Sequence, residues 1–242
     1  METLDASRNL AHQVTHALGR AIVQGKYAGD HIVITEAELS DQFKISRTVT
    51  REAVKMLSAK GLLSSRQRRG ITVAPCNQWN MFDEDVLSWT LSTTPTLQLL
   101  KEFVQLRLAI EPEAAALAAL CPDLDKIFAI EVAAQDMAIA EDIGDDIYEA
   151  DIAFHTAIFA ATRNRFFIQF RSFIRAALRA SVVWHFRIKD PSSGAADDHL
   201  AVFKCIQAHD AEGASRAMRQ MLEKNIGLIE AALAREQNLV KS

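Results

Sequence analysis

The stretch SRTVTREAVKMLSAKG, from Ser46 to Gly61, decides how the first third of this chain folds. Serine is a preferred N-cap of helices, and glycine commonly ends them, so this stretch predicts one helix with a defined start and stop. The apolar residues between these ends recur at the spacing of a single helical face. They are Val49, Ala53, Val54 and Leu57.

Two further helices are expected upstream of this stretch. Residues 8–25 carry apolar side chains at helical spacing and end in a glycine. A polar loop, KYAGDHIVI, separates them from the short segment TEAELSDQFK. In that segment Thr35 precedes Glu38 by three residues, which is the spacing of a capping box at a helix start.

Downstream, LLSSRQRRGITVAP predicts two short strands, Leu62–Ser64 and Ile71–Val73, around a basic turn. Three helices followed by a two-stranded basic hairpin make a winged helix-turn-helix. We therefore assign residues 1–75 to a winged helix-turn-helix DNA-binding domain, in which the third helix enters a DNA groove.

Arginine suits both guanine edges and phosphates, and the first residues of a recognition helix face the bases. A basic wing can reach the backbone or the minor groove. The alternative is that these arginines are merely solvated, but the ordered series of motifs favours DNA binding. The expected DNA-binding residues are Ser46, Arg47, Thr48, Thr50 and Arg51 in the helix, and Arg66, Arg68, Arg69 and Gly70 in the wing.

The distribution of charge agrees with a single DNA-binding domain. Residues 1–75 hold 11 basic and 7 acidic side chains, a net charge of +4, whereas the rest of the chain holds 16 and 24, a net charge of −8. A basic part on an acidic body is expected when only one domain meets a polyanion.

The remainder of the chain is predicted to be helical. Residues 76–94 form a linker and a connecting helix, and residues 95–242 consist of long amphipathic helices joined mostly by short loops. Such a pattern favours an antiparallel all-α bundle, so the fold class is mainly α.

The composition of the chain indicates in which cellular compartment the protein is expected. No apolar run is long enough to cross a membrane, so no membrane partner is expected. Three widely separated cysteines, Cys76, Cys121 and Cys205, favour free thiols in a reducing compartment. We therefore expect a cytoplasmic protein.

The helical body contains polar residues that share helix faces. Asp151 and His155 are four residues apart, and His199 lies on another predicted helix. Together they suit a divalent ion such as zinc, nickel or a manganese-like metal. Spacing alone leaves open a core aspartate–histidine pair without metal. Arg107 and Glu111, also four residues apart, form at least a local ion pair.

The sequence EAELSDQFKISRTVTREAVKMLSAKGLL, followed by RRGITVAP, resembles the winged helix of the GntR family of bacterial transcription regulators. The downstream body resembles the FCD effector domain of its FadR-type branch, and the likeness covers essentially the whole chain. The connector APCNQWNMFDEDVLSW is similar to that of sugar-acid-responsive members. One departure is Ala37, where the family often carries an arginine that contacts DNA.

The resemblance implies a metal site and an effector site in the helical body. FCD domains commonly bind a divalent metal through an aspartate, a histidine one turn later and two further histidines. Asp151, His155 and His199 match the first three ligands, while Met221 stands in place of the fourth. The resemblance also makes Arg107 the group that grips an effector carboxylate. The expected effector-binding residues are Arg107, Asp151, His155, Trp184, His199 and Asn225, with His185 as a further candidate.

These features predict a ligand-responsive transcription regulator rather than an enzyme. It would bind a palindromic operator in double-stranded DNA as a homodimer, because two-fold protein symmetry matches such a site. A small carboxylate such as an aldonate would release it. Two alternatives remain open at the level of sequence: a metal-dependent enzyme with a DNA-binding appendage, and a ligand-free DNA-binding scaffold.

Overall fold

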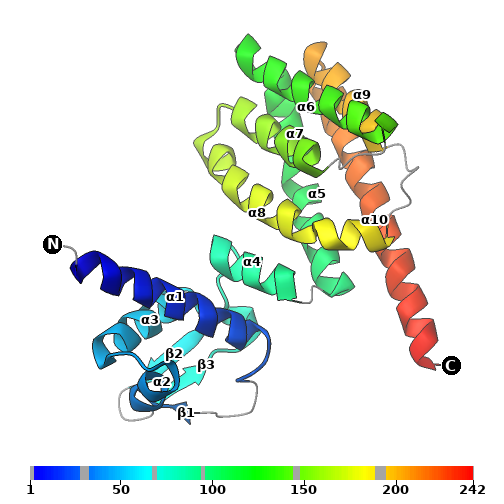
Figure 1. Cartoon of the computed structure of the whole chain (residues 1–242). Coiled ribbons are helices and arrows are strands. Elements are labelled where there is room, and N and C mark those ends of the chain that lie inside the picture. The colour runs from blue at the N-terminus through cyan, green and yellow to red at the C-terminus, as the bar shows by residue number, and fades with distance from the viewer. Residues whose placement is uncertain are drawn as a thin grey trace. The chain divides into compact units, whose positions relative to one another are not determined.

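The computed structural model describes residues 3–27, 33–66, 70–93, 96–143, 148–188 and 195–241. The chain divides into two compact units, Met1–Thr94 and Pro95–Ser242, each of which is described by itself (Figure 1). The first contains helices around a small sheet, and in the second the described residues form helices joined by short loops. The predicted mainly-α class is confirmed.

The first unit begins with α1 (Thr3–Val23) and the short α2 (Glu36–Phe43). The capping box predicted at α2 is present. The Thr35 side chain accepts a hydrogen bond from the Glu38 amide at 3.2 Å, and the Thr35 amide donates to Glu38 Oε2 at 2.8 Å. These bonds satisfy amides that a helix start leaves without intrahelical partners.

The decisive stretch forms α3 (Arg47–Ala59), with Ser46 as its N-cap. The Ser46 hydroxyl accepts from the Val49 amide at 3.3 Å. At the other end Gly61 has a φ of 78° and donates to the Ser58 carbonyl, while the Leu62 amide donates to the Leu57 carbonyl. This pair of bonds is a Schellman motif, and it requires the left-handed conformation that glycine adopts without strain.

The sheet has three strands rather than the two predicted. They are β1 (Val33–Ile34), β2 (Leu63–Arg66) and β3 (Gly70–Val73), antiparallel in the order β1-β3-β2. The prediction of a loop over KYAGDHIVI was wrong for its last two residues. Val33 and Ile34 form β1 and pair with Thr72 and Ile71 of β3. A two-residue strand is too short to show alternation in the sequence, so only pairing with β3 reveals it.

The connector continues the first unit with a 3₁₀ turn, η1 (Cys76–Gln78), and α4 (Glu84–Thr93). Lys60 at the end of α3 contacts Asp83 at 2.8 Å and Asp85 at 2.9 Å. On α4 the Trp89 indole N–H donates to His16 Nδ1 at 3.1 Å. Its ring packs so closely on Gly19 that a Cβ there would lie 2.2 Å from the indole. These contacts attach α4 to α1 and α3.

The second unit is built from long helices around α5 and α10, which pack along each other. α7 contacts α5, α6 and α8, and α9 contacts α5, α6 and α10 (Figure 1). None of the described helices is long and apolar enough to cross a membrane. The helices are α5 (Leu97–Ala119), α6 (Leu124–Ile143), α7 (Tyr148–Ala161), α8 (Arg165–Ile188), α9 (Ala195–Gln207) and α10 (Ala211–Lys241).

Candidate functional site

The start of α3 presents the residues that sequence assigned to base contacts. Arg47 and Thr48 are exposed, and Ser46, which caps the helix, is exposed as well. Their side chains project from the N-terminal turn, where a recognition helix meets base edges. The inward face of the same helix is buried in the core of the first unit, as predicted.

Thr50, predicted to contact DNA, is instead buried between α2 and α3. Its side chain is 1% exposed, and its hydroxyl lies 2.8 Å from that of Ser40 on α2. It also donates to the Ser46 carbonyl at 3.2 Å. Thr50 therefore fixes α2 against α3. A β-branched polar residue at this spacing looks the same in sequence whether it faces a partner helix or DNA.

Of the remaining residues predicted to contact DNA, some are exposed and others lie outside the described part of the chain. Arg51 is exposed and contacts Glu36 Oε2 at 3.3 Å, a surface pair too weak to hold the arginine away from a phosphate. In the wing, Arg66 pairs through its backbone with Gly70, whose φ is 78°. The side chain of Arg66 and the whole of Arg68 and Arg69 lie outside the described residues.

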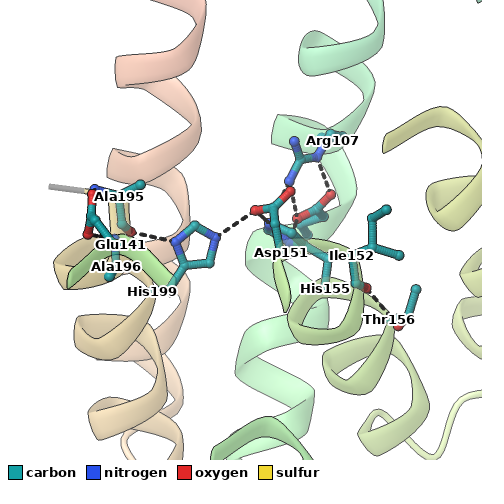
Figure 2. A network of polar contacts seen from close by, with 10 residues as sticks. Arg107, Glu141, Asp151, Ile152, His155, Thr156, Ala195, Ala196 and His199 are labelled. Carbon is teal, nitrogen blue, oxygen red and sulfur yellow. Dashed lines mark hydrogen bonds and ion pairs between the residues drawn. The ribbon is translucent and has the colours of Figure 1, made fainter. Parts of the chain in front are cut away.

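A second cluster of polar residues lies inside the helical unit (Figure 2). Arg107 Nε donates to Glu111 Oε1 at 2.6 Å, and Arg107 Nη2 lies 2.7 Å from His155 Nε2. His155 Nδ1 lies 2.7 Å from Glu111 Oε2, close enough for electrostatic attraction but not aligned as a hydrogen bond. These three residues, from α5 and α7, are at most 2% exposed.

Asp151 joins this cluster to α9. Its Oδ1 lies 3.5 Å from His155 Nε2 and 3.0 Å from His199 Nε2. The structure thus brings together the three residues that sequence proposed as metal ligands, and their ligand atoms all lie within 4.8 Å of one another. Asp151 is 20% exposed at its side chain, so the cluster reaches solvent at this residue.

The hydrogen-bond partners of His199 demand a positive charge beside Asp151. His199 Nδ1 lies 2.7 Å from the Ala195 carbonyl, which can only accept, so Nδ1 carries a proton. The other nitrogen, Nε2, faces a carboxylate oxygen, which also only accepts. Two lone pairs repel at this distance, so the arrangement requires either a second proton on His199 or a cation between the two atoms.

His155 presents the complementary case. A guanidinium has donors but no acceptor, so the contact with Arg107 requires a lone pair on His155 Nε2. Burial opposes a charge on His155, whereas Glu111 raises the pKa of its ring. Glu111 and Asp151 outweigh burial, so the pKa of the ring is raised overall. When Arg107 donates to His155, Nε2 holds its lone pair, the form in which it can bind a metal, and the ring proton lies on Nδ1.

The carboxylates of the cluster are held ionised. Burial would raise the pKa of Glu111, but Arg107 and His155 outweigh it and lower this pKa to about 2. Burial opposes ionisation of Asp151 too, yet the neighbouring His155 and His199 hold its pKa well below the usual value. Burial would also lower the pKa of Arg107, and Glu111 raises it.

These residues fit a divalent metal ion on two counts. Metal–ligand bonds of about 2.0–2.2 Å place neighbouring ligand atoms about 3.0–3.5 Å apart, the spacing of Asp151 Oδ1 from both histidine nitrogens. Each histidine is also contacted at Nδ1, by Glu111 or by the Ala195 carbonyl, as metal-binding histidines usually are. The ion would satisfy the positive charge that Asp151 and His199 require.

Glu141 is a supporting residue that sequence reasoning missed. Its two carboxylate oxygens accept from the Ala195 amide at 3.1 Å and the Ala196 amide at 3.0 Å, at the start of α9 (Figure 2). A carboxylate here satisfies free amides and complements the helix dipole. Because α6 and α9 are far apart in sequence, no spacing rule could have identified this cap.

The other predicted effector residues are only partly placed. Met221, which stands where a fourth ligand was expected, is buried in α10, and Asn225 one turn later is half-buried. The backbone of Trp184 lies in α8, but its side chain and that of His185 lie outside the described residues.

A winged helix with an exposed recognition helix, joined to a helical unit with a buried ionisable cluster, defines a DNA-binding regulator with an effector-type domain. Family models agree with this class. Residues 10–73 match "Bacterial regulatory proteins, gntR family", and residues 102–224 match "FCD domain". The chain belongs to the GntR family of bacterial transcription regulators, in its FCD branch, which places it among regulators rather than enzymes.

Two relatives from Escherichia coli K12 match along most of their length. The galactonate operon transcriptional repressor is 31% identical, with 88% of this chain and 94% of the relative covered. The uncharacterized HTH-type transcriptional regulator YieP is 30% identical, with 91% and 96% covered. Among solved structures, Lar of Listeria monocytogenes has a TM-score of 0.56 at 16% identity, covering 91% of this chain and 96% of Lar, which supports the fold alone.

Replacing Glu111 with glutamine should strongly destabilise the helical unit. The amide has nearly the same shape, but it leaves Arg107 buried without its counter-charge, which costs about 3–5 kcal/mol. Chemical denaturation should show this loss. The matched control, Glu113→Gln on the exposed face of the same helix, should change stability by no more than about 0.5 kcal/mol. Equal stability of the two variants would contradict the pairing described here.

Replacing Glu141 with alanine should loosen the start of α9 and the histidine that follows it. Loss of a helix cap costs about 1 kcal/mol. We also expect the ring ¹H and ¹⁵N resonances of His199 to shift and broaden, because its Nδ1 partner is the Ala195 carbonyl of that same turn. Asp142→Ala, at the exposed neighbouring position, is the control. An unchanged His199 spectrum in Glu141→Ala would refute the positioning role.

Proposed function

We propose that this protein is a transcriptional repressor that binds operator DNA and is released by a small carboxylate, most simply a sugar acid of the aldonate class. The observation that carries the proposal is the buried Arg107, which lies beside two histidines and an aspartate inside the effector-type unit. Arginine binds carboxylates through paired hydrogen bonds. The similarity to a galactonate operon repressor supports both the ligand class and the sign of regulation.

In this proposal two kinds of group in the helical unit bind the effector: an arginine and a metal ion. Arg107 grips the carboxylate, while Asp151, His155 and His199 hold a divalent metal that would bind and polarise the oxygens of the acid. Trp184 and Asn225 remain proposed as further contacts with the body of the effector. Binding shifts the protein toward a state with lower affinity for DNA, because the effector binds that state more tightly.

DNA binding is proposed to rest on Ser46, Arg47, Thr48 and Arg51 of α3, together with Arg66, Arg68, Arg69 and Gly70 of the wing. Two copies of the chain would read the halves of a palindromic operator. Self-association is supported by α6, whose outer face exposes Leu124, Phe128, Ile139 and Ile143, each at least 58% exposed. Apolar surface of this kind marks interaction sites. We expect the protein to act in the cytoplasm, where its DNA is.

Sugar acids should stabilise the purified protein against heat. A ligand at a hundred times its dissociation constant adds about 2.7 kcal/mol to the free energy of unfolding. Differential scanning fluorimetry with aldonates, galactonate first, should therefore raise the Tm by several degrees, and prior chelation should reduce the shift. In Arg107→Ala the shift should disappear. If no acid shifted the Tm with or without metal, the bundle would be a ligand-free scaffold and the proposal would fail.

The two arginines at the start of α3 should differ in their effect on DNA recognition. On a site selected from a random library, Arg47→Ala should lose specificity at one position and cost about 1–3 kcal/mol of binding free energy. Arg51→Ala, one turn further along, should weaken binding to all sequences and lower its salt dependence. Lys55→Ala, exposed on the same helix, serves as the control. Binding unaffected by Arg47→Ala would contradict the assignment of α3.

A further inference from the structure

We propose that Arg107 and the divalent metal compete for Nε2 of His155, so that metal binding frees the guanidinium to receive the effector carboxylate. The inference deepens the proposed function and rests on it. It makes Arg107 a group that couples metal to effector, in addition to one that contacts the effector. The coupling follows from three features of the cluster in Figure 2.

The first feature is that Arg107 engages the metal-binding atom of His155. Arg107 Nη2 lies 2.7 Å from His155 Nε2. An imidazole nitrogen has one lone pair, and it lies in the plane of the ring. A guanidinium stays charged in proteins and offers only donors. A hydrogen bond from Arg107 and a bond to a metal therefore exclude each other at this atom.

The second feature is that the other two metal ligands already face the same atom. Asp151 Oδ1 lies 3.5 Å from His155 Nε2, and His199 Nε2 lies within 4.8 Å of both. An ion that uses all three must take the lone pair that Arg107 now holds. The cationic guanidinium would also repel an ion so close to it. Metal binding thus requires the end of the arginine to turn away.

The third feature is that Arg107 cannot leave the site when it turns. Its Nε remains bonded to Glu111 Oε1 at 2.6 Å, and the residue is 2% exposed. Nη2 keeps one acceptor, Glu111 Oε2 at 3.4 Å, but the N–H that it directs at His155 would then be buried without an acceptor, which is unfavourable. A carboxylate supplies two acceptor oxygens and a negative charge, and it fits the guanidinium in bidentate geometry.

When the metal binds alone, one N–H of Arg107 is left buried without an acceptor. When the acid binds alone, the hydrogen bond from Arg107 to His155 must break. Bound together, each removes the cost of the other, so their affinities are coupled. The coupling is reciprocal: the factor by which the acid tightens the metal equals the factor by which the metal tightens the acid. A metal site without this arginine contact would show no such link.

The test is calorimetric titration of Zn²⁺ into chelator-treated full-length protein, with and without saturating galactonate. We expect the metal to bind at least tenfold more tightly with the acid, and the acid to gain by the same factor from the metal. In Arg107→Met the metal should bind at least tenfold more tightly than to the wild type in the absence of acid, and galactonate should no longer change its affinity.

Two further variants serve as a back-up and as a control for Arg107→Met. Arg107→Lys keeps a positive charge beside Glu111 and should fold if Arg107→Met does not; its shorter reach should likewise relieve the competition at His155. Lys101→Met removes a positive charge from the same helix at its ion pair with Glu230, away from the cluster, and should retain full coupling. Circular dichroism verifies that each variant is folded.

The outcomes separate this inference from the function on which it rests. If wild-type protein binds both galactonate and Zn²⁺ but neither alters the other, the competition is refuted while the regulatory function stands. The same holds if galactonate binds and Zn²⁺ does not. If neither galactonate nor any other aldonate binds with or without Zn²⁺, both the coupling and the proposed effector class are overturned.

Discussion

The buried contact of Arg107 with Glu111 and His155 is the constraint on which the helical unit depends. Two charged side chains and an imidazole lie between α5 and α7 at 2% exposure or less, so each must satisfy the others. Glu111 contacts both neighbours and is held ionised by them, with a pKa lowered to about 2 against the effect of burial. A core that needed only stability could have used apolar residues here.

From Arg107, Glu111 and His155 the polar contacts continue through Asp151 to the start of α9. His155 and His199 both face Asp151, and His199 in turn is held by the first turn of α9, which Glu141 caps from α6. Four helices thus fix the positions of three ligand atoms. Rigid supporting helices of this kind give a site the precision that metal or effector binding requires, because small displacements weaken each contact.

The first unit has a constraint of its own, in the attachment of α4. Lys60 at the end of α3 forms an ion pair with Asp85 at the start of α4, and Asp85 also lies 3.2 Å from His16 Nε2 in α1. Trp89 of α4 packs on Gly19 of α1. A side chain at position 19 would push α4 away, so this glycine is needed for close approach rather than for flexibility. The recognition helix and the connector are therefore parts of one packed body.

The sequence by itself determined the elements whose signals are local. The capping box at Thr35, the Ser46 cap, the Gly61 stop and the apolar face of α3 all depend on residues within a few positions of one another, and helix geometry fixes what such spacing means. The same rule put Asp151 near His155 and Arg107 near Glu111. Tertiary structure alone decided the contacts between elements that are distant in the sequence. It paired Val33 and Ile34 with β3, buried Thr50, placed Glu141 on α9 and set Arg107 against His155, because packing between distant segments leaves no periodic trace in a chain.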